Sequence, residues 1–148
     1  MIVVSDTTAL STLFLLNRLN WLKELFSRIL IPHSVYAELL ELEHAGYDLQ
    51  SLHQADWLIV QGVKNHELVA RLKTELDSGE SEAIVLAIEA EADYLLIDER
   101  KGSRKAGEFG VPTIGLLRVI LELKNQEIID AVRPVLDQIQ SAGGFWMS

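Results

Sequence analysis

Short, largely apolar runs alternate along this chain with longer segments of helical spacing, and this alternation constrains the fold most strongly. The runs cover residues 2–5, 29–32, 57–60, 94–97 and 111–114, and we expect each to be a β-strand. Strands without polar alternation are buried on both faces, which is typical of parallel sheets covered by helices. The sequence therefore predicts an α/β fold.

The segments between the runs carry apolar residues at helical intervals. We predict helices over residues 9–16, 19–26, 33–44, 68–76, 80–87, 101–110, 115–124 and 128–141. The apolar tail, residues 143–148, is expected to dock on the fold or to form an edge contact. No repeat, linker or low-complexity segment interrupts the sequence, so we expect residues 1–148 to form a single domain.

Composition and charge exclude several classes of protein. The 148 residues include no cysteine, which excludes disulfides, thiolate metal sites and cysteine catalysis. The formal net charge of −9 argues against broad, sequence-independent nucleic-acid binding, but it suits carboxylates masked by metal or a basic protein partner. No apolar run approaches the roughly 18 residues of a membrane span. A carboxylate follows within six residues of the start, so we expect no signal peptide and a cytoplasmic location without membrane contact.

Two acids, Asp6 and Asp98, directly follow predicted strands. If those strands are parallel, both carboxylates lie at the carboxyl edge of the sheet, where α/β folds bind ligands. Glu38 and Glu80 are further candidates because they lie near the starts of predicted helices. Glu82 lies two residues after Glu80, roughly 200° around a helix, so one of the two faces the site unless the helix start is frayed.

Clustered carboxylates repel one another, and they are tolerated when a hard cation neutralises them. Mg²⁺ and Mn²⁺ prefer such oxygen ligands, and the natural chemistry of the resulting centre is phosphodiester hydrolysis by a metal-activated water. Each acid taken alone also has a structural interpretation. Asp6 could form a turn or cap a helix, and Asp98 could be a loop residue. Glu38 could be a solvated helix residue, and Glu80 could complement a helix dipole.

Taken together, the acids lie in four segments that resemble, in order, the motifs of the PIN-domain family. The segments are residues 4–10, 31–39, 76–87 and 92–100. In these motifs Asp6 and Asp98 end strands, Glu38 follows a strand and a proline, and Glu80 starts a helix rich in Ala and Ile. The resemblance extends from Met1 to about Ile120. The Gly-Glu-x-Glu-Ala form of the third motif is similar to a prokaryotic PIN-like branch.

Spacing within the resemblance favours Glu80 as the third acid. It lies seven residues before Ala87 and eighteen before Asp98, as in many PIN domains. Glu82 remains a candidate second ligand. Asp93 is a weaker alternative at the last position, because it precedes the strand that Asp98 follows.

The resemblance implies a three-layer fold with a central parallel sheet of about five strands flanked by helices. It also implies Mg²⁺ or Mn²⁺ held by Asp6, Glu38, Glu80 and Asp98, and cleavage of single-stranded RNA. Many small prokaryotic members resemble VapC-type toxins, which often form homodimers and are silenced by an antitoxin protein. We therefore expect an endoribonuclease of toxin type. The alternatives are a non-catalytic module that binds RNA or protein and a phosphohydrolase acting on DNA flaps.

Residues beside the acids are candidates for binding substrate. Thr7 could hold a metal-bound water or the Asp6 carboxylate, or it could cap the following helix. Four basic residues follow Asp98 closely: Arg100, Lys101, Arg104 and Lys105. They could bind RNA phosphates or an acidic antitoxin segment, or they could form a solvated helix face.

Overall fold

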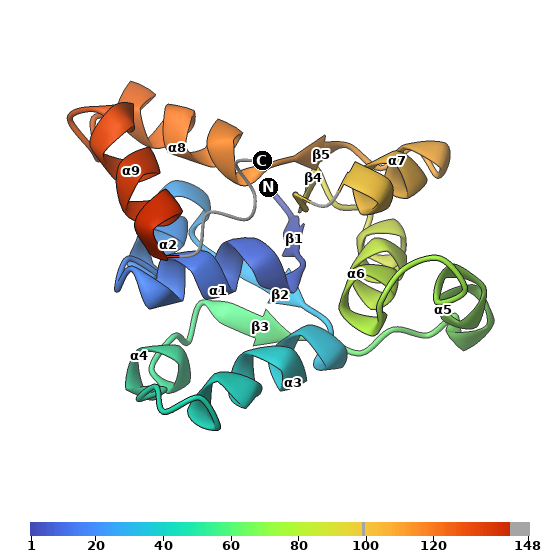
Figure 1. Ribbon diagram of the computed structural model, residues 1–148. Coiled ribbons are helices and arrows are strands. Elements are labelled where there is room, and N and C mark those ends of the chain that lie inside the picture. The colour runs from blue at the N-terminus through green and yellow to red at the C-terminus, as the bar shows by residue number, and fades with distance from the viewer. Residues whose placement is uncertain (99, 143–148) are drawn as a thin grey trace.

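A five-stranded, fully parallel sheet lies at the centre of the computed structural model, which describes residues 1–98 and 100–142 (Figure 1). The strands are β1 (Val3–Ser5), β2 (Ile29–Ile31), β3 (Leu58–Val60), β4 (Tyr94–Leu96) and β5 (Thr113–Ile114). Their order across the sheet is β3-β2-β1-β4-β5, and each neighbouring pair is parallel. This arrangement confirms the α/β fold expected from the apolar runs.

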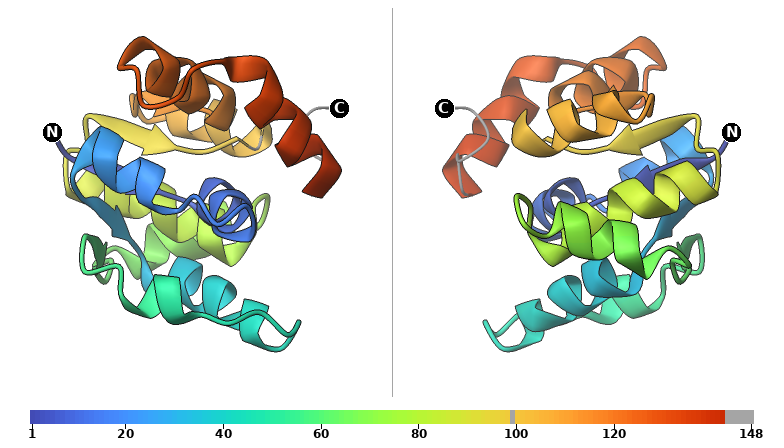
Figure 2. Two further views of the ribbon diagram at one scale, coloured as in Figure 1. Left: turned by 90° about the vertical axis from the view of Figure 1, so that its left-hand side faces the viewer. Right: turned by 90° about the vertical axis from the view of Figure 1, so that its right-hand side faces the viewer.

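Helices cover both faces of the sheet, as the two views of Figure 2 show. One face carries α1 (Thr7–Leu15), α2 (Asn20–Phe26), α3 (His33–Leu40), α8 (Leu116–Asn125) and α9 (Val132–Ala142). The other carries α5 (His66–Leu72), α6 (Ser78–Glu89) and α7 (Arg100–Glu108). Successive strand residues alternate between the two cores, so that Val3 packs against the first set of helices and Val4 against the second. Burial on both faces explains why the strands are apolar without alternation.

The direction in which the chain adds strands reverses at β1. The chain first builds β2 and β3 on one side of β1, and then crosses to the other side to build β4 and β5. The helices of the first crossover lie on one face, and α5 and α6, which lead to β4, lie on the other. In open α/β sheets the crevice beyond the carboxyl ends of two such strands is the usual place for a ligand. The crevice between β1 and β4 is therefore where a site is expected.

The ends of several predicted helices were wrong. The helix predicted over 33–44 ends at Leu40, continues as a 3₁₀ turn, η1 (Glu41–Glu43), and is followed by Gly46 at a φ of +94°. The helix predicted over 68–76 is α5, which begins earlier because Asn65 caps it by accepting a hydrogen bond from the Leu68 amide. The last helix begins at Val132, and the one-turn α4 (Gln50–His53) was not predicted.

Two further expectations concern the ends of the chain and the membrane. The apolar tail, 143–148, for which we expected docking or an edge contact, lies outside the described residues. Within residues 1–98 and 100–142, every helix is too short or too polar to cross a bilayer.

Candidate metal centre

Asp6 and Asp98 lie side by side at the reversal point because β1 pairs with β4. Ser5 is in register with Leu96, and the Asp6 amide donates to the Leu96 carbonyl at 3.0 Å. The Asp6 side chain is 2% exposed, and its Oδ1 accepts the Thr8 amide at 3.2 Å, which caps α1. The position predicted for these two acids, at the carboxyl edge of a parallel sheet, is the position they occupy.

Asp98 caps a second helix and keeps one oxygen unused. Its Oδ1 accepts the Leu116 amide at 2.6 Å, at the start of α8, where the N-cap residue Gly115 has no side chain to offer. Its Oδ2 is buried and has no hydrogen-bond partner within the described residues. Burial raises the pKa of Asp98, although the Leu116 hydrogen bond opposes that rise. A buried carboxylate oxygen without a donor is costly and is an open position for a cation.

Glu80 reaches this crevice from the start of α6. Asp77 caps that helix by accepting the Glu80 amide at 2.8 Å, and the Glu80 carboxylate accepts the Asp77 amide at 3.3 Å, which completes a capping box. The pKa of Asp6 lies well above its usual range, first because of burial and then because of the negative charges of Asp98 and Glu80. The structure therefore brings Asp6, Asp98 and Glu80 within electrostatic range of one another.

Glu38 approaches the same edge from α3. Its Oε2 accepts a hydrogen bond of 2.6 Å from the Thr7 hydroxyl, which links α3 to the first turn of α1. Burial is the largest cause that raises the pKa of Glu38, and the Thr7 hydrogen bond lowers it. The capping role considered for Thr7 was wrong, because Asp6 caps α1 and Thr7 is the first helical residue.

The two remaining acidic candidates have other contacts. Glu82 accepts the Ser34 amide at 3.2 Å and so caps α3, whose N-cap residue, Pro32, offers no side-chain acceptor. Glu80, and not Glu82, is among the charges that raise the pKa of Asp6. Asp93 was a wrong alternative, because it lies before β4, at the opposite end of the sheet, and accepts the Ile2 amide at 2.6 Å.

Three glycines allow the backbone to approach these acids closely. A Cβ atom on Gly115 would lie 2.6 Å from Asp98 Oδ1, and one on Gly79 would overlap the Glu38 carboxylate. A Cβ atom on Gly102 would lie 3.3 Å from Glu80 Oε2. These glycines and Asp77 were not predicted from the sequence. The Asp-x-x-Glu spacing of a capping box could have indicated Asp77.

Four helices begin at the acidic cluster, and a carboxylate caps each of them. Asp6 caps α1, Glu82 caps α3, Asp77 caps α6 and Asp98 caps α8. The amino end of a helix carries a partial positive charge, which favours a carboxylate there by about 0.3–1 kcal/mol. The helix starts therefore offset part of the cost of burial and of repulsion that raises the pKa values of these acids.

The donor set suits a hard divalent cation, because every candidate ligand atom is a carboxylate oxygen and Asp98 Oδ2 is buried without a donor. Within the described residues, no three Asp, Glu, His or Cys side chains gather closely enough to hold a metal ion in these conformations. The capping bonds and the Thr7 bond hold the carboxylates apart. The described acids therefore fit a cation by the chemistry of their oxygen atoms and share one edge of the sheet, but their side chains do not converge on one point in these conformations.

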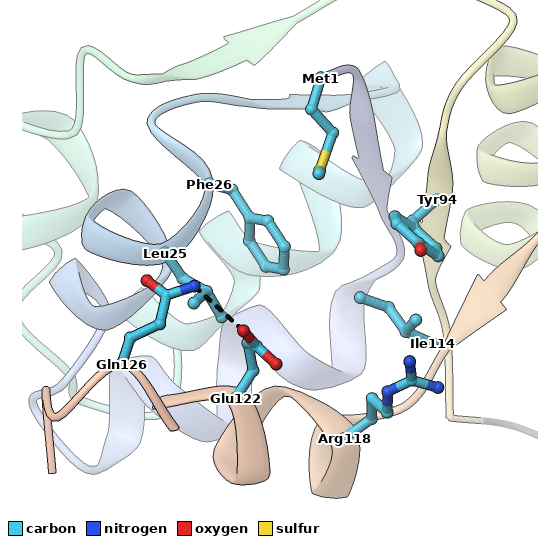
Figure 3. Close-up of a pocket in the computed structure, with 8 residues that line it drawn as sticks. All are labelled: Met1, Leu25, Phe26, Tyr94, Ile114, Arg118, Glu122 and Gln126. Atoms are coloured by element: carbon cyan, nitrogen blue, oxygen red, sulfur yellow. Dashed lines mark hydrogen bonds between the residues drawn. The ribbon is translucent and has the colours of Figure 1, made fainter. Parts of the chain in front are cut away.

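Another cavity, of about 240 Å³, lies away from the acids, near the amino ends of β1 and β4 (Figure 3). Met1, Phe26 and Tyr94 line it, together with two charged residues of α8, Arg118 and Glu122. Its lining is mainly apolar, and the Glu122 carboxylate is occupied by the Gln126 amide at 3.1 Å. Because ligands of parallel sheets bind at carboxyl ends, this cavity is not the candidate centre.

The sheet topology and the acids at its carboxyl edge define an α/β protein of the kind that binds ligands at a strand reversal. A family model described as a PIN domain, DUF3368, matches residues 2–148. The chain therefore belongs to the PIN-domain family, whose members are generally nucleases that use divalent metals. The resemblance drawn from the four motifs is confirmed.

One solved structure similar to this chain is a PilT N-terminus domain protein, SSO1118, from the hyperthermophilic archaeon Sulfolobus solfataricus P2. The two chains share 22% identity with a TM-score of 0.58, over 82% of this chain and 92% of that one. At that identity the likeness shows the fold alone. None of the curated proteins matches this chain.

Proposed function

We propose that this chain is a metal-dependent endoribonuclease that hydrolyses single-stranded RNA in the crevice between β1 and β4. The supporting observation is the pair of acids at the strand reversal, with Asp98 Oδ2 buried and lacking a hydrogen-bond partner within the described residues. Asp6, Glu38, Glu80 and Asp98 would hold Mg²⁺ or Mn²⁺. When bound, such a cation lowers the pKa of a water and stabilises charge on the phosphate.

The protein side chains hold the proposed ligands in position. Asp6 is held by its hydrogen bond from Thr8, and Asp98 by its hydrogen bond from Leu116, so neither carboxylate is free to rotate. Burial raises the pKa of both carboxyls in the metal-free protein, and a bound cation would oppose that rise and favour the charged carboxylates. Thr7 fixes Glu38 at the edge of the same crevice.

The direct test is cleavage of a mixed single-stranded RNA pool with Mn²⁺, with Mg²⁺ and with EDTA. Wild-type protein should cut in the presence of a divalent cation and not with EDTA, and Asp6→Asn should abolish cutting. Asp93→Asn is the matched control, because Asp93 flanks β4 at its other end and asparagine can still accept the Ile2 amide. Undiminished cutting by Asp6→Asn would refute the mechanism. Single-stranded DNA and flap substrates in the same assay test the phosphohydrolase alternative.

A non-catalytic binding module is the rival, and one observation favours it. Asp6, Glu82 and Asp98 each cap a helix, and such roles would keep acids in place without catalysis. A well-folded protein that binds RNA but cuts none of the substrates with any cation would support the rival.

We also propose that the chain is the toxin-type component of a toxin–antitoxin pair. Its motifs resemble those of VapC-type toxins, and a net charge of −9 suits a narrow target and a protein partner better than bulk nucleic acid. Expression in a bacterial host without an antitoxin should arrest growth, and the Asp6→Asn variant should not. Equal growth with both proteins at equal levels would remove the toxin assignment.

A further inference from the structure

An open pocket of about 480 Å³ adjoins Asp98 on the side of α7 and β5. Its lining includes Asp98, Arg100, Ser103, Arg104 and Thr113. The volume lies in the range of about 300–1,000 Å³ that is usual for small-molecule sites. The pocket shares Asp98 with the candidate metal centre, so a ligand in it would lie directly beside that centre.

Three of the four basic residues of α7, Arg100, Arg104 and Lys105, differ in their contacts. Lys105 is held by Glu75 at 2.7 Å and by Glu108 at 3.2 Å, so its charge has a structural role. No carboxylate of the described residues lies within the 4.0 Å of an ion pair from Arg100 or Arg104. These two arginines lie four positions apart, on one face of α7, and both line the pocket. Two guanidinium groups without a carboxylate partner are suited to a phosphate.

The lining of the pocket also includes a pair of hydroxyl groups. Ser103 Oγ on α7 and Thr113 Oγ1 on β5 are 3.0 Å apart and part-buried. One hydroxyl donates to the other, which leaves the pair one further O–H donor and acceptor lone pairs. A ribose 2′-hydroxyl is likewise both donor and acceptor, and it is the group that distinguishes RNA from DNA.

We propose that this pocket binds the nucleotide next to the bond that is cut, with a phosphate on Arg100 and Arg104 and the ribose 2′-hydroxyl on the Ser103–Thr113 pair. The pocket then selects RNA over DNA. The proposal rests on the proposed function, which places the reacting phosphate at Asp98. It adds that the sugar is recognised by two hydroxyls outside the acidic cluster.

The test measures binding by the uncleaving Asp6→Asn protein, so that no product forms. Short labelled RNA and DNA oligonucleotides of one base sequence are titrated in Mg²⁺ and followed by fluorescence anisotropy. On this background, Arg100→Gln or Arg104→Gln should weaken RNA and DNA binding alike, about tenfold or more. Arg133→Gln, at an exposed position on α9, is the charge-matched control and should change neither affinity.

The hydroxyl pair is tested by the RNA-to-DNA affinity ratio. Ser103→Ala combined with Thr113→Val should weaken RNA binding about fivefold and leave DNA binding unchanged. Thr113→Ser keeps the hydroxyl and should keep the ratio, and Ser51→Ala on α4 is the control for loss of an unrelated hydroxyl. Thermal melting of each variant separates loss of binding from loss of folding.

The outcomes separate this proposal from the proposed nuclease. An unchanged RNA-to-DNA ratio in the folded double hydroxyl variant overturns the pocket assignment, even if wild-type protein cuts RNA. If the RNA-to-DNA affinity ratio of the double hydroxyl variant falls as expected but wild-type protein cuts no substrate, the RNA pocket is supported and the nuclease proposal is refuted. The assignment is also overturned if Arg100→Gln and Arg104→Gln bind the RNA and DNA oligonucleotides with the same affinity as the Arg133→Gln control.

Discussion

Asp6 is buried, and Glu38 and Asp98 are partly buried, which disfavours their charged forms. The stability of the protein without metal should therefore depend on pH in the direction opposite to that of most carboxylates. The pKa of Asp6 in the folded state is raised well above the value near 4 of an unfolded chain, and those of Glu38 and Asp98 are raised too. Between the unfolded and folded values the folded state binds more protons, so stability falls as pH rises. Each proton contributes a slope of up to about 1.4 kcal/mol per pH unit.

We therefore expect Asp6→Asn to raise the melting temperature in EDTA at pH 7 and to flatten its decline between pH 5 and pH 7. Asparagine removes the buried charge and keeps an oxygen for the Thr8 amide. Melting curves of both proteins across that range check this, with Asp93→Asn as control. An Asp6→Asn protein that melts below wild type at neutral pH in EDTA would contradict it.

The glycines behind the acids give a second prediction for single residues. Gly115→Ala would place a Cβ atom 2.6 Å from Asp98 Oδ1 and displace that carboxylate, and overpacking of this kind costs about 1–3 kcal/mol. We expect weaker Mn²⁺ binding by calorimetry together with a lower melting temperature. At Gly62, an added Cβ would meet only ordinary contacts of 3.5 Å with His33, so Gly62→Ala is the control. Unchanged Mn²⁺ affinity in Gly115→Ala would show that the glycine does not set the position of Asp98.

At the scale of one element, α7 contains two glycines in contrasting surroundings. A Cβ atom on Gly102 would lie 2.7 Å from Ile97 Cδ1, whereas one on Gly107 would meet nothing within 4 Å. Gly107→Ala should raise the free energy of unfolding by about 0.5–1 kcal/mol, since alanine favours a helix interior. Gly102→Ala should lower it by about 1–3 kcal/mol through overpacking. Urea denaturation of both variants checks this, and changes of the same sign would contradict it.

The elements that the sequence predicted well are those specified by local pattern. All five apolar runs form strands, because a strand buried on both faces leaves its signature within a few residues. Helix ends were less accurate where termination depends on detail, as at Leu40, where α3 tightens into a 3₁₀ turn. The one-turn α4 has too few residues to show a period.

The candidate site was predictable in its acids but not in its hydrogen bonds. The spacing of the motifs picked out Asp6, Glu38, Glu80 and Asp98, and the structure gathers them at one edge of the sheet. The partners of these acids come from distant segments: Thr7 lies 31 positions from Glu38, and Leu116 lies 18 positions from Asp98. A single sequence holds no signal for such pairs, because only the fold brings them together.

At the scale of the whole molecule, a bound cation should stabilise the folded state. A ligand that binds only that state adds about 2.7 kcal/mol at a hundred times its dissociation constant. We expect Mn²⁺ or Mg²⁺ to raise the melting temperature at pH 7, to raise it less at pH 5 where the acids begin to take up protons, and to leave Asp6→Asn unchanged. Sodium chloride at equal ionic strength controls for screening of a net charge of −9. An equal rise with sodium chloride would contradict a specific site.

The four helix starts that meet the acids determine the order in which fold and metal can assemble. In proteins such as zinc fingers the metal arrives first and the fold follows, so chelators denature them. Here the amides of Thr8, Ser34, Glu80 and Leu116 already donate to Asp6, Glu82, Asp77 and Asp98 without metal, although Asp98 Oδ2 has no partner among the described residues. The fold is complete before any ion binds. Removal of the metal by a chelator should therefore abolish activity but leave the protein folded and able to bind metal again.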